Sequence, residues 1–372
     1  MDLRPKRYAL AVELTPYCNQ KCAYCYNAWR DDPPGAQGLA GGELLRLLDK
    51  ALTEVSFEHV TLTGGEPFAR PELFDVLAVV RRHGLRALII SNGGLVTPEL
   101  ASRLVAYDPY FVQVTLNGPD AALHEAHVGA GHDHFEKTLR GIRCLREHGV
   151  RVSGCVVVTR KNAHALGDTL ALFQSLGVAD IALSRFSPAG YASEHTAALL
   201  PSRGDLVRAL TLAEPYGQRG MRLQVTMPVP PCMVDTALFP SLRFSSCPIG
   251  TAQQEFALGP KGELRHCTLH TEALGSVAQE SAAVLVESPR VAAYRDVTPA
   301  FCAPCAHRES CLGGCGAAAA AVSGDPRGLD PVVAQHVDDT LRQRLLAARG
   351  GTEVFVPVGR LRASRTPPEA LP

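Results

Sequence analysis

The sequence has no apolar run that approaches the ~18 residues of a membrane-spanning helix and no excess of charge, because Lys plus Arg number 37 and Asp plus Glu also number 37. The first absence argues against a membrane protein, and the second argues against a nucleic-acid partner, which calls for a basic surface. The stretch before the first apolar run is too short for a secretory signal peptide. We therefore expect a cytoplasmic protein with a small or peptidic partner, and with neither a membrane nor a nucleic acid among its partners.

Cysteine, by contrast, is abundant, with 12 residues spread unevenly over the chain. Without an export signal a disulfide framework is not expected, so this many thiols argue for bound metal. Three thiols open the chain, two lie singly at Cys144 and Cys155, and seven fall between residues 232 and 315. The two single thiols are expected in the core, since free cysteine is commonly buried.

The first three thiols are Cys18, Cys22 and Cys25, with the spacing C-x3-C-x2-C. A cubane iron–sulfur cluster normally takes four thiolates, so three thiols leave one iron open to a ligand from outside the protein. A structural zinc site is the alternative, but it needs a fourth ligand nearby, and Cys144 is far along the chain. Three ordinary buried cysteines are the other alternative. The spacing favours a cluster, with the chemistry at its open iron.

In the first half of the chain, short β-branched or aliphatic runs alternate with amphipathic stretches, which predicts repeated βα units around a parallel sheet. Strands are expected at Leu10–Leu14, His59–Thr63, Ala87–Ser91, Phe111–Asn117, Arg151–Thr159 and Ile181–Phe186. Helices are expected at Glu43–Leu52, Glu72–Arg82, Pro98–Val105, Phe135–His148 and Ala165–Leu176. Six units are too few for a closed eight-stranded barrel. The predicted fold is α/β, a partial (β/α)6 TIM-like barrel with its working groups at the carboxyl ends of the strands.

Glycine-rich turns follow several of these strands, the second one ending in Thr63-Gly64-Gly65-Glu66-Pro67. Glycine lets backbone approach a ligand closely, and the Glu66 carboxylate suits a cationic ammonium group. Such turns are also common connectors between elements. The argument for a site rests on several of them sharing one end of the sheet with the cysteine loop.

The C-x3-C-x-aromatic-C motif followed by Gly-Gly-Glu-Pro resembles the radical S-adenosylmethionine (SAM) enzymes, over roughly the first 190 residues, the size of one domain. The resemblance implies that Cys18, Cys22 and Cys25 bind a [4Fe-4S] cluster and that SAM binds its open iron. The residues that it implies around SAM are Gly64, Gly65, Glu66 and Pro67 at the methionine ammonium, Tyr24 at the adenine, and Ser91, Thr115 and Asn117 at the ribose. The implied activity is reductive cleavage of SAM to a 5′-deoxyadenosyl radical that abstracts a hydrogen in a dry site.

Beyond Gly190 the chain is punctuated by proline, and its one long periodic run is about Asp205–Tyr216. We expect one helix and then a linker. A hairpin is expected over Gln254–His270, around the turn at Gly259–Gly262. A dense run of four thiols then follows at C-x2-C-x5-C-x3-C, namely Cys302, Cys305, Cys311 and Cys315. Four thiols this close predict bound metal, with zinc and iron–sulfur both open.

Together with Cys247 and Cys267, this run resembles the SPASM extension, a cysteine-rich α+β domain that houses two auxiliary [4Fe-4S] clusters. The implied ligands are Cys247, Cys267 and Cys315 for the first cluster, and Cys302, Cys305 and Cys311 for the second. Each set has only three thiols. The last cysteine of the family pattern falls near Val333, with Asp330 and His336 as the nearest donors, and Cys232 is expected to be a spare buried thiol.

The expected domains are a radical SAM core over 1–200, a helix and linker over 201–231, the SPASM-type domain over 232–348 and a loosely ordered tail over 349–372. The leading hypothesis is an enzyme that modifies a ribosomally made peptide. No leader-binding domain is expected before the cysteine motif, so a separate recognition protein or a groove on this chain would hold the peptide. A flavodoxin or ferredoxin would supply electrons.

Two alternatives stay open. The enzyme could act on a small molecule or cofactor precursor, or the chain could be an iron–sulfur electron-transfer or assembly protein without radical chemistry. An electron carrier would not require the Gly64–Pro67 turn. Four histidines after the fourth predicted strand are expected in a solvated loop, namely His124, His127, His132 and His134.

Overall fold

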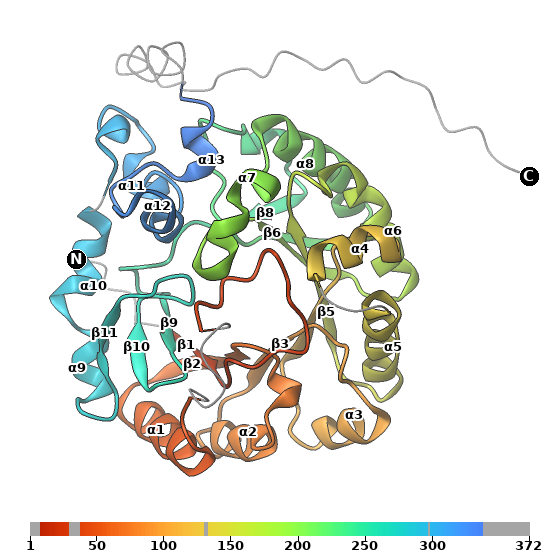
Figure 1. Cartoon of the computed structure of the whole chain (residues 1–372), viewed down its shortest axis with the longest axis vertical. Helices are drawn as coiled ribbons and strands as arrows, with labels where there is room; N and C mark the ends of the chain where they lie inside the picture. Colours follow the sequence, from red (N-terminus) through yellow and green to blue (C-terminus); the bar gives the residue numbers. More distant parts are fainter. Residues whose placement is uncertain (1–7, 30–37, 130–132, 297, 338–372) are drawn as a thin grey trace, which may run out of the picture.

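A computed structural model describes residues 8–29, 38–129, 133–296 and 298–337. The predicted tail over 349–372 and His132 lie outside the described residues. The molecule is built around one 11-stranded sheet with the strand order β11-β10-β9-β1-β2-β3-β4-β5-β6-β7-β8. Figure 1 shows this sheet curving around the centre of the molecule, with helices on its outer side.

The six strands predicted from the sequence form the middle of the sheet, and each is parallel to the next. These strands are β1 (Tyr8–Glu13), β2 (Phe57–Thr63), β3 (Ala87–Ser91), β4 (Phe111–Thr115), β5 (Val152–Val158) and β6 (Asp180–Arg185). The helices of this half are α1 (Gly41–Glu54), α2 (Leu73–Arg82), α3 (Pro98–Val105), α4 (Ala121–Val128), α5 (His134–Glu147), α6 (Leu166–Ser175), α7 (Thr196–Leu199) and α8 (Arg203–Gln218). The prediction of a partial (β/α)6 barrel is confirmed.

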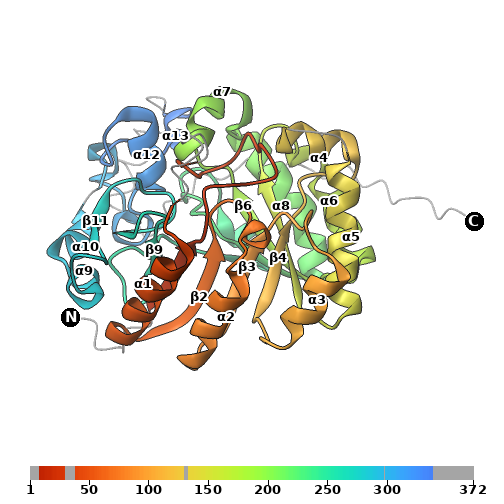
Figure 2. The same ribbon diagram turned by 60° about the horizontal axis from the view of Figure 1, so that its bottom comes forward.

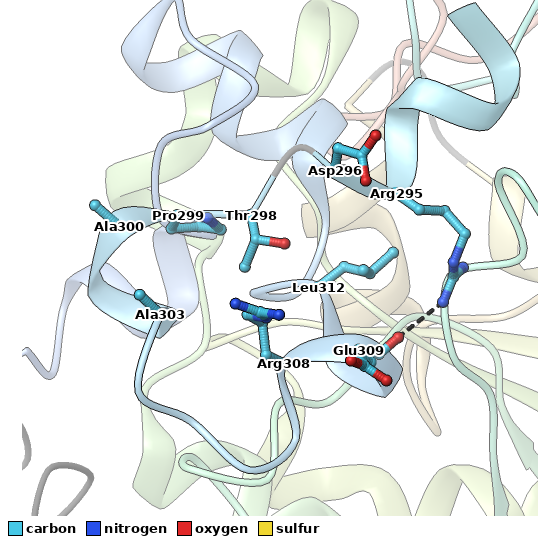
Figure 3. Close-up of a pocket in the computed structure, with 9 residues that line it drawn as sticks. All are labelled: Arg295, Asp296, Thr298, Pro299, Ala300, Ala303, Arg308, Glu309 and Leu312. Carbon is cyan, nitrogen blue, oxygen red and sulfur yellow. Dashed lines mark hydrogen bonds between the residues drawn. The ribbon is translucent and has the colours of Figure 1, made fainter. Parts of the chain in front are cut away.

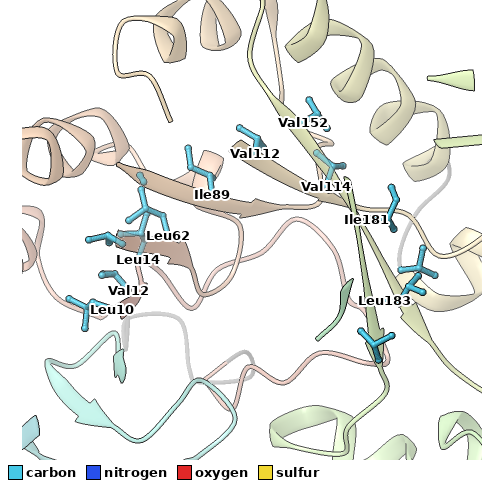
Figure 4. Packing of buried hydrophobic residues seen from close by; sticks show 14 of the residues in the cluster. Leu10, Val12, Leu14, Leu62, Ile89, Val112, Val114, Val152, Ile181 and Leu183 are labelled. Carbon is cyan, nitrogen blue, oxygen red and sulfur yellow. The ribbon is translucent and has the colours of Figure 1, made fainter. Parts of the chain in front are cut away.

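The core lies between this sheet and the helices that cover it. Figure 4 shows apolar side chains placed side by side on neighbouring strands, among them Leu10, Leu62, Ile89 and Val112, all 0% exposed. Leucines of α1 such as Leu47 belong to the same buried cluster. Parallel strands covered by helices read as nearly continuous apolar runs, which explains why these strands were visible in the sequence.

The sheet continues beyond the predicted strands at both edges. After β6 come β7 (Arg222–Val225) and β8 (Leu242–Phe244), both parallel to the strand before them. The sequence predicted a linker where β7 lies and the start of the SPASM-type domain where β8 lies, and it predicted neither strand, because four and three residues are too few to show a period. Beyond β1 come β9 (Glu255–Leu258), β10 (Glu263–Arg265) and β11 (Ala273–Ser276).

The predicted hairpin is the antiparallel pair of β9 and β10. Strand β9 also pairs with β1 in parallel, with Leu10 opposite Phe256 and Val12 opposite Leu258. The C-terminal part is therefore joined to the barrel through the sheet itself. Its remaining helices are α9 (Ala282–Val286), α10 (Pro289–Ala293), α11 (Arg308–Cys311), α12 (Gly316–Ser323) and α13 (Pro331–Ala334).

Two buried ion pairs hold the C-terminal part against the barrel. Arg185 at the end of β6 pairs with Asp330 at 2.7 Å, and Arg265 on β10 pairs with Glu13 at the end of β1. All four side chains are at most 1% exposed. Breaking a buried pair leaves a charge without a partner in a poorly solvated place, which is strongly destabilising.

Among the described residues, no helix has the length and apolar character that a membrane crossing requires.

Candidate active site

The loop that carries Cys18, Cys22 and Cys25 follows β1 and lies at the carboxyl ends of the parallel strands. In Figure 2 it is the red trace that runs across one end of the barrel, near α4 and α7. All three thiols are partly buried. The prediction that the cysteine loop and the strand-end turns share one end of the sheet is confirmed for the turn after β2 and the segment after β6. Both bond directly to the loop, as does the end of α4.

The glycine turn after β2 holds the first part of the loop. The backbone N–H of Gly65 donates to the Thr15 carbonyl at 2.6 Å, and that of Glu66 donates to the Tyr17 carbonyl at 2.8 Å. A Cβ atom on Gly65 would lie 1.9 Å from the Tyr17 oxygen. Only glycine allows the two backbones to come this close, so Gly65 is needed for the shape of the cysteine loop itself.

Two further segments hold the rest of the loop. At the end of α4, the carbonyls of Val128 and His127 accept from the backbone N–H groups of Lys21 and Ala23, at 3.0 and 2.9 Å. On the other side, the turn after β6 places the Ala192 N–H 2.8 Å from the Cys25 carbonyl. The thiols are thus positioned by main-chain bonds from three separate segments, the turn after β2, the end of α4 and the segment after β6.

The histidines of α4 are buried, which corrects the prediction of a solvated loop. His124 and His127 are 1% and 0% exposed. His124 Nδ1 accepts from the Asn117 N–H at 3.2 Å, and His127 Nε2 lies 2.9 Å from the Thr159 hydroxyl. Burial lowers the pKa of His124 to about 4. The prediction was wrong because side-chain bonds to the ends of β4 and β5 pull this helix into the core, and sequence spacing does not show those bonds.

His134 is also buried, at 7% exposed, and belongs to the first turn of α5. The predicted helix began one residue later, at Phe135, so the histidine was expected in the loop. Of the four histidines, none of the three that the structure describes is solvated.

Amide groups surround Cys18. The Asn92 Nδ2 atom lies 3.8 Å from Cys18 Sγ and donates to Asn19 Oδ1 at 2.7 Å, while the Gln20 N–H lies 3.5 Å from the same sulfur. Burial raises the pKa of Cys18 to about 11, and these N–H donors oppose that rise. The protein alone therefore does not favour a Cys18 thiolate, and bound iron would supply the missing positive charge. Sequence analysis missed Asn92, although it directly follows Ser91 in the same glycine-rich turn.

Glu66 is 1% exposed, and its carboxylate already accepts three hydrogen bonds. The Ser91 hydroxyl and the Phe68 N–H donate to Oε1 at 2.8 and 3.1 Å, and the Asn92 N–H donates to Oε2 at 2.9 Å. Two carboxylate oxygens have about four acceptor positions, so one position is left for a cationic group. Burial raises the pKa of Glu66 to about 7.

Asn117, just beyond the end of β4, is 0% exposed, and its Nδ2 donor makes no hydrogen bond of good geometry within the described chain. Its Oδ1 accepts from the Val157 N–H at 2.8 Å, and its amide lies near the Tyr24 hydroxyl, whose pKa it lowers against the larger rise from burial. Leaving a buried donor unpaired costs about 1–3 kcal/mol. A polar ligand at this strand end would supply the missing acceptor, so the observation fits a bound cofactor.

The other residues implied at SAM lie on the same elements. Ser91 ends β3 and is buried, Thr115 ends β4 and is partly buried, and Pro67 is buried directly after Glu66. Tyr24 lies within the cysteine loop, where burial raises its pKa well above the usual range. The structure therefore brings all the residues proposed for SAM binding to one end of the barrel.

In the C-terminal part, Cys247, Cys267 and Cys315 form a first group of thiols, together with Tyr294. Burial raises the pKa of Cys267 to about 12, and the charges of Cys315 and Cys247 raise it further. Burial raises the pKa of Tyr294, and the same three thiols raise it further; its hydroxyl lies 3.1 Å from His270 Nε2. The three predicted ligands of the first auxiliary cluster therefore lie within range of one another's charge.

Cys302, Cys305 and Cys311 form a second group, which lines one cavity. Cys232, the thiol expected to be a spare buried residue, lines the same cavity and is only partly buried. Val333, at the position of the family's last cysteine, lines it as well. Of the two single thiols predicted in the core, Cys155 is buried, whereas Cys144 is only partly buried and packs against the core.

A larger cavity of about 700 Å³ lies beside this second group. Figure 3 shows its lining, which includes Arg295, Arg308 and Leu312, with Arg295 donating to the Glu309 carbonyl at 2.8 Å. All its lining residues fall between positions 295 and 312, so it belongs to the C-terminal part and not to the cysteine loop at residue 18. Arg308 lines both cavities.

Comparison with known proteins agrees with this geometry. Residues 12–173, which hold the cysteine loop and the first strand-end turns, match the Radical SAM superfamily. Residues 12–173 are therefore a radical SAM domain. The protein is a radical SAM enzyme with a SPASM-type extension, and its cofactors are SAM, a [4Fe-4S] cluster and auxiliary clusters.

Three relatives show how far the likeness reaches. An AdoMet-dependent heme synthase from Nitratidesulfovibrio vulgaris is 32% identical over 193 residues, 52% of each chain. The mycofactocin maturase MftC of Mycobacterium tuberculosis is 28% identical, covering 83% of this chain and 78% of that one. A PqqA peptide cyclase from Granulibacter bethesdensis is 27% identical, covering 92% of this chain and 91% of that one. The first match spans only about half of that relative, whereas the other two span most of both chains.

Solved structures share the fold. The structure of native anSMEcpe with bound AdoMet and Cp18Cys peptide covers 92% of this chain and 99% of its own, with a TM-score of 0.67 and 19% identity. Streptococcus suis SuiB bound to precursor peptide SuiA covers 87% of this chain and 75% of its own, with a TM-score of 0.65 and 15% identity. The radical SAM enzyme therefore shares the fold of both over barrel and extension.

Proposed function

We propose that the enzyme modifies a ribosomally made peptide by abstracting one of its hydrogens. The observation that supports this most is the coverage of the relatives. Those named as a peptide cyclase and a maturase match over 92% and 83% of the chain, whereas the heme synthase matches over only 52%. The likeness to the two peptide-directed relatives therefore reaches into the extension, whereas the likeness to the heme synthase spans only about half of the chain.

We propose Cys18, Cys22 and Cys25 as the ligands of the cluster that binds SAM. When bound, the reduced cluster and SAM supply a 5′-deoxyadenosyl radical, while the protein holds and aims it. The glycine turn and α4 fix the thiols, and the free acceptor position of Glu66 receives the methionine ammonium. The Nδ2 of Asn117 donates to the ribose, near Thr115 and Ser91. Tyr24 lies at the adenine, and Pro67 closes the turn beside Glu66.

A separate protein for the leader segment of the peptide and a flavodoxin or ferredoxin as electron donor complete the proposal. The described residues contain no feature that identifies either partner. The proposed cytoplasmic location follows from the reduced thiols that the clusters need.

The test uses anaerobically reconstituted enzyme with reductant and SAM, together with synthetic copies of short Cys- or aromatic-rich peptides encoded beside its gene. We expect one peptide to increase the rate of 5′-deoxyadenosine formation and to change in mass. If every such peptide is inert while deoxyadenosine still forms, the peptide proposal fails and the small-molecule alternative gains. If no deoxyadenosine forms with the clusters present, the assignment of the SAM site fails.

A further inference from the structure

Four thiols from two distant segments line one cavity in the C-terminal part. The motif of residues 302–311 supplies Cys302, Cys305 and Cys311, and the proline-rich stretch after β7 supplies Cys232. The rest of the lining is mainly apolar or small, namely Pro230, Pro231, Phe301, Gly313 and Val333, with His307 and Arg308 as its polar members. Four thiols in an apolar cavity match the ligand set of a cubane cluster.

The motif of three thiols is shaped by tight local turns. The Cys305 N–H donates to the Cys302 carbonyl at 2.9 Å, and the Cys311 N–H donates to the His307 carbonyl at 2.8 Å. Gly313 has a positive φ of 80°, and a Cβ atom there would lie 3.5 Å from Cys302 Sγ and 2.6 Å from the Pro299 ring. The chain therefore folds back over its own thiols, and the segment of Cys232 lines the same cavity.

Cys232 lies in a segment that hydrogen bonds hold in place beside the cavity. It lies in a turn in which the Met233 N–H donates to the Pro230 carbonyl at 2.8 Å. Met233 is 1% exposed, and its carbonyl accepts from Arg203 Nε on α8 at 2.8 Å. The neighbouring residue of Cys232 is thus buried and bonded, so the thiol is held at the cavity.

The side-chain donors nearest to Val333, where the family pattern has its last cysteine, make hydrogen bonds to other parts of the chain. His336 Nε2 accepts from the Arg203 N–H at 3.0 Å. Asp330 binds Arg185 through both carboxylate oxygens and also accepts from the Cys315 and Val332 N–H groups. Neither residue lines the cavity, whereas Val333 does but has no ligand atom.

We propose that Cys232 is the fourth ligand of the second auxiliary cluster, in place of the cysteine that Val333 replaces. Each of the four thiols loses its proton to solvent as its sulfur binds iron. A cubane held by four thiolates has no open iron, so this site transfers electrons and does not bind a substrate. The proposal concerns this chain's own thiols, and it is independent of whether the substrate is a peptide.

The test compares full-length wild type with Cys232→Ala after anaerobic reconstitution, measuring iron, sulfide and zinc per chain and the EPR spectrum of the oxidised protein. Wild type should carry about twelve irons, four in each of three cubanes. Cys232→Ala should fall to about eight irons, or to about eleven with the signal of a three-iron cluster. Cys144→Ala, which removes a thiol on α5 away from this cavity, should match wild type.

A double variant makes the test specific. Val333→Cys places a thiol on the same cavity, so Cys232→Ala/Val333→Cys should recover about twelve irons and lose the three-iron signal. Loss of a merely structural residue would not be repaired at Val333. Because Cys232→Ala could impair folding, Cys232→Ser serves as the near-isosteric variant, in which the EPR spectrum should change while far-UV circular dichroism does not.

Three results would overturn the proposal. The first is that both Cys232 variants keep the wild-type iron content and spectrum. The second is that His307→Ala, and not Cys232→Ala, removes the irons, which would make the cavity's histidine the ligand. The third is about one zinc and eight irons in wild type. The described residues include no group of three His, Cys, Asp or Glu side chains arranged around one metal ion, and the measurement of zinc decides this point directly.

Discussion

The cysteine loop at residue 18 and the thiol cavity at residue 302 each contain a motif of three thiols in a short stretch. The residues that the fold packs around the two motifs differ. Around Cys18 the neighbours are amides and a buried carboxylate, including Asn92, Gln20 and Glu66. Around Cys302 they are prolines, a phenylalanine, a valine and a further thiol. The difference teaches that a three-thiol motif does not fix the number of ligands, because the segments packed on it decide whether the fourth corner is open or closed.

The largest expected difference between the two places is in SAM cleavage. Cys18→Ala, Cys22→Ala and Cys25→Ala should each abolish 5′-deoxyadenosine formation and remove about four irons, because each thiolate holds the cluster with the open corner. The two other cubanes should remain. Iron analysis and chromatographic detection of deoxyadenosine check this result, with Cys144→Ala as the control. Intact deoxyadenosine formation in any of the three variants would contradict the assignment.

The next effect concerns the contact between barrel and extension. Asp330→Asn leaves the buried Arg185 guanidinium without its counter-charge, and the expected loss is about 3–5 kcal/mol in the free energy of unfolding. Asp108→Asn is the matched control, because its pair with Arg86 is exposed and should contribute at most about 1 kcal/mol. Denaturant unfolding of both variants provides the comparison. Equal losses would show that Arg185–Asp330 does not hold the extension in place.

A smaller effect is expected at Glu66, which distinguishes the polar loop from the apolar cavity. Glu66→Gln removes the charge that pairs with the methionine ammonium, and SAM binding should weaken by about 1.5–3 kcal/mol, roughly 10- to 150-fold. Iron content should stay the same, since Glu66 ligates nothing. Equilibrium binding of SAM to the reconstituted protein measures the change. Unchanged affinity would show that Glu66 only holds the turn, through its bonds from Ser91, Phe68 and Asn92.

The smallest effect is the pH dependence of the same contact. Because burial raises the pKa of Glu66 to about 7, the charged form that binds the ammonium is lost as pH falls through that value. The affinity for SAM should increase about tenfold between pH 6 and pH 8, as expected for one titrating group. The stability of the protein without SAM should change in the opposite sense, because the folded state binds this proton more tightly than the unfolded one. Its contribution is full below about pH 4.5 and is lost as pH rises through 7.

Glu66→Gln supplies the control for that measurement, since the amide does not titrate. In this variant the affinity for SAM should be flat between pH 6 and pH 8. A slope that persists in Glu66→Gln would assign the pH dependence to another group and leave the charge state of Glu66 without effect on binding.

The sequence was informative where one short segment contains the whole signal. The strands β1 to β6 were predicted because each contains a short run of β-branched or aliphatic residues, which is nearly continuous in β1 at Leu10 and Val12. The turn at Gly64 and Gly65 was predicted because close backbone contact admits no side chain. The strands β7 and β8 were missed because three or four residues carry no period of their own.

What the sequence by itself determined is therefore local: the cysteine spacings, the glycine turns, the barrel strands and the radical SAM domain that they indicate. Only the tertiary structure decided how separate segments meet. It buried His124 and His127 against the ends of β4 and β5, placed Asn92 beside Cys18, and paired β9 with β1. It also brought Cys232 to the cavity of Cys302. The physical reason is that spacing along the chain specifies ligands within one turn, whereas packing between distant segments sets which residue closes a site.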